Sequence, residues 1–129
     1  MPHSFRVKVY YEDTDAGGVV YYGKYLGYLE RARTEFLAEH GINVAELHNA
    51  GYLFAVTHVD IRYKRPAMLG ETVEVTTEVV ELKNVSLTLE NRILRGGELL
   101  IEAKVTFACI GSDRKLRRLP DGFGKLKEC

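Results

Sequence analysis

The fold is decided by residues 22–41, which read YGKYLGYLERARTEFLAEHG. Apolar and aromatic side chains recur there at steps of three and four: Tyr22, Tyr25, Leu29, Ala32 and Phe36. This period is typical of an amphipathic helix with one buried face. Glycine commonly follows the last helical turn, so Gly41 marks the end. We predict one long helix from Tyr22 to His40.

The sequence on both sides of this helix alternates between apolar and polar residues, which is the period of half-buried strands. Before the helix, the alternation runs through Phe5, Val7, Val9 and Tyr11. After it, four further runs alternate: residues 59–64, 73–79, 85–93 and 99–109. The sequence Arg95-Gly96-Gly97-Glu98 is typical of a tight hairpin turn. The basic tail at 114–118 is a candidate for a short edge strand.

The order of the elements indicates an α+β domain with an antiparallel sheet. We find no internal repeat, low-complexity tract or linker, so we expect residues 1–129 to form a single domain. One helix cannot cover both faces of such a sheet. The sheet must therefore curl around the helix or bury its other face against a partner, and we expect a homo-oligomer.

The composition excludes some classes of partner. The chain has 18 Lys and Arg residues and 18 Asp and Glu residues, so its net charge is zero. A bulk electrostatic grip on nucleic acid or an anionic membrane needs an excess of cations, and we expect neither partner. The N-terminus lacks the apolar region of a signal peptide, and no apolar run is long enough for membrane insertion. With Cys109 and Cys129 expected to be unpaired, we predict a protein of the reducing cytoplasm.

Three carboxylates lie close together where the first strand ends: Glu12, Asp13 and Asp15. A glycine pair and then the predicted helix follow them. The first N–H groups of a helix have no intrahelical acceptor and carry the positive end of its dipole. A carboxylate beside them provides a nucleophile or general base, together with donors for a carbonyl that becomes an oxyanion. The same residue types also occur in purely structural turns, so residue chemistry alone leaves all three acids open.

This region also carries a resemblance to a known family. The segments RVKVYYEDTD at 6–15, Glu30-Arg31-Ala32-Arg33 and Tyr63-Lys64-Arg65-Pro66-Ala67 occur in family order. The chain resembles the 4-hydroxybenzoyl-CoA thioesterase family, and most closely its branch of Tol-Pal-associated acyl-CoA thioesterases. The resemblance covers nearly the whole chain and weakens in the C-terminal tail. It implies a hot-dog fold, in which a curved antiparallel sheet wraps around one long helix, assembled as a dimer or homotetramer.

The resemblance also implies which residues are catalytic. The family's catalytic aspartate occupies an Asp-x-x-Gly-[Val/Ile]-Val pattern just before the helix, and this pattern matches Asp15 rather than Asp13. The backbone N–H at the helix start, here Tyr22 or Gly23, is implied to polarise the thioester carbonyl. Many relatives in the branch have His where this chain has Tyr22. The main-chain role survives that difference because it needs no side chain.

Further residues are candidates for binding the substrate. Glu30 matches a carboxylate that contacts the hydroxyl of the acyl group in the hydroxybenzoyl-specific enzymes. Tyr25 could line an acyl pocket, although an aromatic residue at helical spacing is more often part of the core. The phosphates of CoA need a local cation, and Arg65 is the candidate in the 62–65 cluster. Ser86 ends a turn that lies near the pantetheine or nucleotide in relatives.

The resemblance thus predicts an acyl-CoA thioesterase that releases a free acid and CoA from a short-chain aliphatic or aromatic acyl-CoA, with no metal or cofactor. Two alternatives stay open. A hot-dog enoyl-CoA hydratase or dehydratase needs a His base early in the helix, and the sequence has none near Tyr22. A non-catalytic module that binds acyl-CoA or acyl-carrier protein would use the same fold without turnover.

Overall fold

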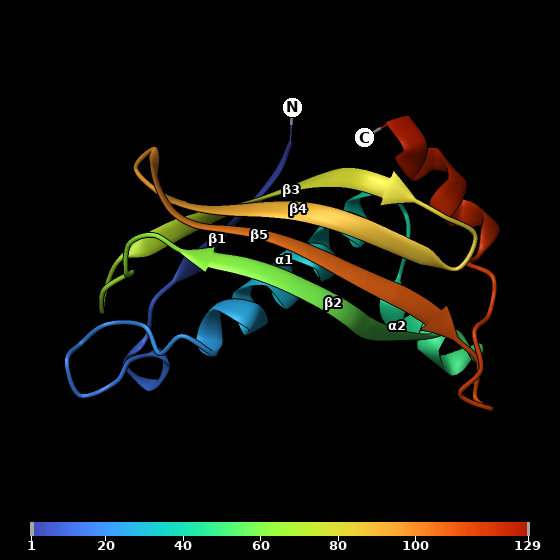
Figure 1. Cartoon of the computed structure of the whole chain (residues 1–129), viewed down its shortest axis with the longest axis horizontal. Helices are drawn as coiled ribbons and strands as arrows, with labels where there is room; N and C mark the ends of the chain where they lie inside the picture. Colours follow the sequence, from blue (N-terminus) through green and yellow to red (C-terminus); the bar gives the residue numbers. More distant parts are fainter. Residues whose placement is uncertain (1, 129) are drawn as a thin grey trace.

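The computed structural model of the chain describes residues 2–128. Its elements, shown in Figure 1, are β1 (His3–Lys8), η1 (Tyr11–Asp13), α1 (Lys24–Glu39), α2 (Val44–Asn49), β2 (Leu53–Tyr63), β3 (Thr72–Leu82), β4 (Ser86–Arg95), β5 (Glu98–Ile110) and η2 (Asp121–Glu128). The five strands form one antiparallel sheet in the order β1-β3-β4-β5-β2. The predicted hairpin at 95–98 joins β4 to β5.

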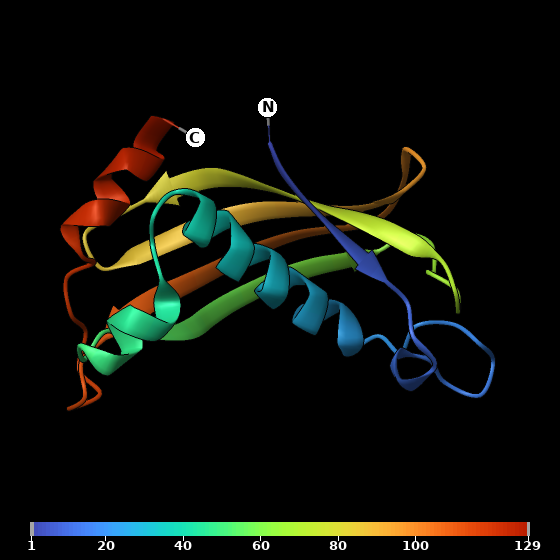
Figure 2. The same cartoon turned by 180° about the vertical axis from the view of Figure 1, so that it is seen from behind.

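The long helix α1 lies across one face of the curved sheet, as Figure 2 shows. It ends as predicted, since Gly41 has the left-handed φ of +76° that suits glycine after a helix. Its apolar face is buried: Tyr25, Tyr28, Leu29, Ala32, Phe36 and Leu37. The first four of these pack on Val73, Val75 and Ile101 of the sheet, and the last two pack on Leu87, Leu89 and Phe107. One helix in a curved antiparallel sheet is the hot-dog fold, and the α+β prediction is confirmed.

The opposite face of the sheet is polar. Along β4, Leu87, Leu89 and Ile93 are buried under α1, whereas Thr88, Glu90 and Arg92 between them are half-buried. The Arg92 guanidinium contacts the carboxylate of Glu90 at 3.1 Å, and the hydroxyl of Thr88 bonds to that of Thr106 on β5 at 2.7 Å. The sheet has therefore curled around its helix, which is one of the two solutions that the sequence left open.

Several boundaries predicted from the sequence are wrong. The strand does not reach Tyr11, because the chain leaves β1 after Lys8 and turns through η1, where Tyr11 is 80% exposed. The helix begins at Lys24, which leaves Tyr22 outside it and 63% exposed. Residues 114–118 form no strand but only a single bridge, between Ile110 and Leu116.

Besides η1, two short helices were not predicted. The six-residue α2 follows α1, and the 3-10 helix η2 closes one end of the core with Phe123 and Leu126, both almost fully buried. Cys109 is a free, buried cysteine, as expected, and Cys129 lies outside the described residues. Among residues 2–128, no helix combines the length and the apolar character needed to cross a bilayer.

The edge strand β2 leaves part of its helix-facing side uncovered. Val56 and Val59 are 49% and 37% exposed, and Leu26 on the neighbouring face of α1 is 42% exposed. A register shift between Val56 and His58 bends the strand there. An unpaired edge with exposed apolar side chains is a surface that favours association with another chain.

Candidate active site

The loop between β1 and α1 is held in a defined path by its own backbone. Thr14 pairs with Val20 in a single antiparallel bridge, and the Asp15 N–H donates to the Val19 carbonyl at 2.9 Å. The Gly18 N–H donates to the Asp15 carbonyl at 3.1 Å. The φ of +78° at Gly18 is one that other residues rarely adopt, which explains the glycine in this turn.

Asp15 occupies the first position of this turn. One carboxylate oxygen, Oδ1, accepts the Gly17 N–H at 2.8 Å, and the residue is exposed. This hydrogen bond fixes the direction of the side chain while using only one of several acceptor positions on the carboxylate. Asp15 is therefore an ordered carboxylate that water or a ligand can reach.

Asp13 has the opposite environment. It is 7% exposed, and its Oδ2 accepts hydrogen bonds from the Tyr28 hydroxyl at 2.8 Å and from the Tyr10 N–H at 3.0 Å. The ammonium of Lys24 lies 3.9 Å from Oδ1. Burial of the Tyr28 phenol and its hydrogen bond to Asp13 raise the Tyr28 pKa far above its usual value. Asp13 is a buried structural acceptor, which distinguishes it from Asp15.

The start of α1 is tied to the same loop. The Tyr21 N–H donates to the Asp13 carbonyl at 2.9 Å, and the Lys24 N–H donates to the Tyr21 carbonyl at 2.9 Å. Within residues 2–128, the N–H groups of Tyr22 and Gly23 have no acceptor in hydrogen-bond range. These two donors at the positive end of the helix dipole are available to an external oxygen atom.

An open pocket of about 250 Å³ adjoins the helix start, and it is lined by Val20, Tyr22, Tyr25, Tyr63, Lys64, Arg65 and Pro66. Its walls are mainly aromatic: the Tyr63 ring lies 6.4 Å from the Tyr22 ring and 5.7 Å from the Tyr25 ring. Since Val20 is the bridge partner of Thr14, the turn that carries Asp15 lies next to this wall.

Tyr25 has two roles in this pocket. It is only 3% exposed, and its hydroxyl accepts the Ala67 N–H at 2.9 Å, which joins α1 to the segment after β2. Burial raises the pKa of the Tyr25 phenol above its ordinary value, which favours its protonated form. Tyr25 is thus a core residue whose ring also forms part of the pocket wall.

The predicted site residues do not all come together in one chain. Tyr22, Tyr25 and Arg65 line the pocket at the start of α1, and Gly23 directly precedes that helix. Asp15 lies in the preceding loop, where its N–H is bonded to the Val19 carbonyl. Arg65 is 64% exposed at its side chain and pairs with Glu98 at 3.1 Å, so its charge is partly used within the chain.

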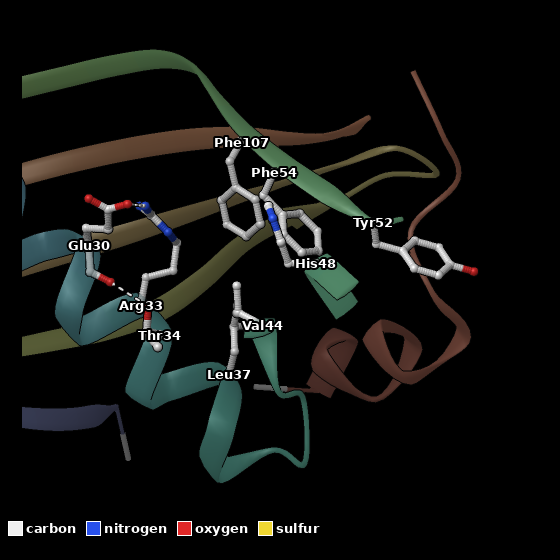
Figure 3. Close-up of a pocket in the computed structure, with 9 residues that line it drawn as sticks. All are labelled: Glu30, Arg33, Thr34, Leu37, Val44, His48, Tyr52, Phe54 and Phe107. Carbon is white, nitrogen blue, oxygen red and sulfur yellow. Dashed lines mark hydrogen bonds and ion pairs between the residues drawn. The ribbon is translucent and has the colours of Figure 1, made fainter. Parts of the chain in front are cut away.

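Glu30 and Ser86 lie elsewhere. Glu30 is on an exposed face of α1 and lines a different pocket, shown in Figure 3. Ser86 pairs with Ala108, near the end of the sheet where Leu53 begins β2. Tyr63, at the candidate site, is the last residue of β2 and pairs with Ile101, at the opposite end of the strands. Within a single chain, Ser86 is therefore separated from the helix start by most of the length of the sheet.

Sequence reasoning missed two contributions to the site. Tyr63 forms a wall of the pocket, and its hydroxyl lies 3.4 Å from the Tyr22 carbonyl. The Tyr28–Asp13 hydrogen bond fixes the loop from the side of the core. Tyr63 stood in a sequence segment that resembled the family, but only the strand register brings it to the helix start.

Most of this chain is similar to known thioesterases. Residues 9–125 match the family model of the thioesterase-like superfamily. The acyl-CoA thioester hydrolase YbgC of Escherichia coli O6:H1 is 40% identical over 116 residues, covering 88% of this chain and 87% of that protein. The acyl-CoA thioesterase YbgC of Haemophilus influenzae is 44% identical over 108 residues, covering 83% and 79% of the two chains.

Solved structures are similar to this chain in both fold and sequence. The crystal structure of a probable thioesterase from Bartonella henselae has a TM-score of 0.88 and 38% sequence identity, and the match covers 93% of this chain and all of that one, 100%. A protein from Thermus thermophilus has a TM-score of 0.91 and 34% identity, with 97% of each chain covered. The chain therefore belongs to the thioesterase-like superfamily.

Proposed function

We propose that this protein, a thioesterase by family, hydrolyses an acyl-CoA thioester to a free acid and CoA, with Asp15 as the catalytic carboxylate. The observation that carries the proposal is the loop at the start of α1. It holds the exposed, oriented carboxylate of Asp15 and, beside an aromatic pocket, the N–H groups of Tyr22 and Gly23, for which the described residues 2–128 provide no acceptor. The curated relatives, at 40% and 44% identity, are named as acyl-CoA thioester hydrolases and support the same reaction.

Two routes would use the same residues. In the first, the Asp15 carboxylate takes a proton from water while the water oxygen bonds to the thioester carbon. In the second, a carboxylate oxygen bonds to that carbon itself, and water then hydrolyses the mixed anhydride. In both routes the C–S bond breaks, and the CoA thiolate leaves and takes up a proton. The N–H groups of Tyr22 and Gly23 donate to the carbonyl oxygen while it carries negative charge.

The pocket at the helix start suits a small acyl group. Its aromatic walls, from Tyr22, Tyr25 and Tyr63, favour a short aliphatic chain or a single ring. Lys64 and Arg65 at its rim provide the local cations that the phosphates of CoA require in a chain without net charge. Acyl-carrier protein is an alternative carrier of the acyl group at the same rim, and the reducing cytoplasm is the expected compartment.

A homo-oligomer, as a dimer or tetramer, is the proposed assembly. The exposed valines of β2 and the uncovered Leu26 give each chain an apolar edge to bury. Ser86 lies at the far end of the sheet from its own helix start, so we expect a second copy to bring its Ser86 to CoA bound there. Glu30, on the exposed face of α1, would likewise contact the acyl group from a second copy of the chain.

The activity is tested by incubating the protein with aliphatic and aromatic acyl-CoAs and measuring both free thiol and free acid. We expect equal amounts of the two products with the preferred substrate. Glu12→Gln is the matched control for Asp15→Asn, because Glu12 is exposed on the same loop. Asp13→Asn is not a silent control, since the Asp13 carboxylate is buried and hydrogen-bonded. Hydration of an enoyl-CoA without thiol release, or tight acyl-CoA binding without turnover, would contradict the proposal.

A further inference from the structure

The segment that connects β2 to β3, residues 64–71, runs beside the loop that carries Asp15. In both views this connector lies between that loop and the β4–β5 hairpin, at one end of the sheet (Figure 1 and Figure 2). Three interactions join the two backbones: the Val20 N–H donates to the Ala67 carbonyl at 2.9 Å, the Leu69 N–H donates to the Gly18 carbonyl at 3.0 Å, and Val19 forms a bridge with Met68. The position of the loop therefore depends on the position of the connector.

Ala67 is the residue of the connector that contacts both the loop and α1. It is fully buried, and while its carbonyl accepts the Val20 N–H, its own N–H donates to the Tyr25 hydroxyl at 2.9 Å. Tyr25 belongs to the first turn of α1. One residue thus fixes the loop that carries Asp15 relative to the N–H donors at the helix start.

Arg95, the last residue of β4, holds the connector from the side of the hairpin. Its Nη1 donates to the Pro66 carbonyl at 3.2 Å and to Oε1 of Glu71 at 2.8 Å. The same Glu71 oxygen accepts the Met68 N–H at 2.7 Å. The Pro66 carbonyl belongs to the peptide group whose N–H is that of Ala67. Arg95 therefore fixes one side of this peptide group while Tyr25 fixes the other.

The charge of Arg95 is directed into the chain. Its side chain is 27% exposed, and its Nη2 donates to Oε1 of Glu98 at 2.7 Å, in addition to the contacts with Pro66 and Glu71. The hydrogen bonds to Glu98 and Glu71 raise the pKa of Arg95, which favours its charged form. Arg65, by contrast, is 64% exposed at its side chain. With three acceptors around its guanidinium, Arg95 is suited to hold backbone in place rather than to bind a ligand.

We propose that Arg95 is a positioning residue for the hydrolysis, which acts by fixing the connector and through it the loop that carries Asp15. This inference rests on the proposed function, in which Asp15 and the N–H groups of Tyr22 and Gly23 act on the thioester. Arg95 itself does not contact the substrate. A displacement of reacting groups by about 1 Å can lower a rate on the order of a hundredfold, so a small shift of the loop should slow the chemical step.

The kinetics of variants test this role. Arg95→Met removes the donors, and kcat for thiol release should fall about tenfold to a hundredfold, with KM changed by less than about threefold. Arg95→Lys keeps the charge without the planar guanidinium and should recover part of the rate. Arg92→Met is the matched control, because Arg92 lies on the same strand and pairs with Glu90 and Glu102 on the other face of the sheet. It should retain the wild-type rate.

The Asp15→Asn background separates positioning from a general loss of stability. Instability would lower the rate by the same factor in any background, whereas a positioning residue acts through the group that it positions. Arg95→Met should therefore reduce kcat much less in the Asp15→Asn variant than in the wild type. Equal fold losses in the two backgrounds would overturn the proposal.

Hydrogen exchange measured by NMR tests the same contact without catalysis. In Arg95→Met the amide protons of Val20 and Leu69 should exchange at least about tenfold faster, whereas that of Cys109, at the far end of the sheet, should change less than about threefold. Unchanged rates at Val20 and Leu69, or an equal rise at Cys109, would overturn the proposal even if Asp15→Asn is inactive. If Val20 and Leu69 alone respond while Asp15→Asn keeps the wild-type rate, Arg95 holds the loop and the catalytic role of Asp15 is wrong.

Discussion

The hydroxyl of Tyr28 in α1 donates a hydrogen bond of 2.8 Å to Oδ2 of Asp13 in η1. The same carboxylate oxygen accepts the Tyr10 N–H, and the Asp13 carbonyl accepts the Tyr21 N–H. One buried acid thus connects the end of β1, the start of α1 and the second turn of that helix. Asp13 is thereby suited to position the loop that carries Asp15, rather than to react itself.

Loss of the Tyr28 hydroxyl should destabilise the fold. In Tyr28→Phe the buried Asp13 carboxylate loses one of its hydrogen-bond donors, which costs about 1–3 kcal/mol of unfolding free energy. Urea denaturation of Tyr28→Phe, Asp13→Asn and the double variant measures this cost. Because both residues make one interaction, the double variant should lose less than the sum of the two single losses. Strictly additive losses would show that the two side chains do not interact.

Alkaline pH should weaken the protein through the same phenol. The pKa of Tyr28 is raised in the folded state by burial and by Asp13, whereas the unfolded chain keeps the ordinary value near 10.0. The contribution of neutral Tyr28 to stability is therefore complete below pH 10.0 and declines as pH rises above it. Denaturation measured between pH 8 and 11 should show a smaller alkaline decline in Tyr28→Phe than in the wild type. Equal declines would contradict this assignment.

Replacing Gly18 should disturb the turn that orients Asp15 more than replacing Gly17 does. Gly18→Ala forces a side chain into φ +78° and should cost about 1–2 kcal/mol of stability together with a severalfold loss in kcat. Gly17→Ala is the matched control, because the added Cβ would lie 3.4 Å from Asp15 Oδ1, an ordinary contact. Thermal unfolding and thiol release measure the two effects. A Gly17→Ala variant that loses more than Gly18→Ala would refute this explanation of the turn.

The edge strand β2 should be an interface between copies of the chain. Val56→Lys places a charge on the exposed apolar edge and should lower the molecular mass measured by sedimentation equilibrium. Val80→Lys on β3 is the matched control, because both valines are 49% exposed. If the two variants keep the mass of the wild type, or if Val80→Lys alone dissociates it, the interface lies elsewhere.

The main elements of the fold follow from periodicity in the sequence. The 3.6-residue period predicts α1 because one continuous stripe, from Tyr25 to Phe36, is buried. Periodicity misplaces both ends of the loop, since Tyr11 continues the strand alternation and Tyr22 the helical period, but both side chains are exposed. Short helices escape detection because α2 has only six residues, too few to establish a period.

The candidate site is harder to predict, because it depends on contacts between distant residues. Spacing alone could not separate Asp13 from Asp15, and the resemblance to a family selected Asp15. Burial now distinguishes them, since only Asp13 is enclosed by Tyr28. Tyr63 reaches the helix start through the β2–β5 register, which no local pattern encodes.

We propose Asp15 as the carboxylate that performs the hydrolysis. The most direct measurement is the kcat of Asp15→Asn for thiol release from the preferred acyl-CoA, compared with wild type and with Glu12→Gln. The amide keeps the size of the side chain and removes its charge, so kcat should fall by about 10²–10⁴ with little change in KM. Glu12→Gln should retain the wild-type rate. An Asp15→Asn variant that hydrolyses the substrate at the wild-type rate would contradict the assignment.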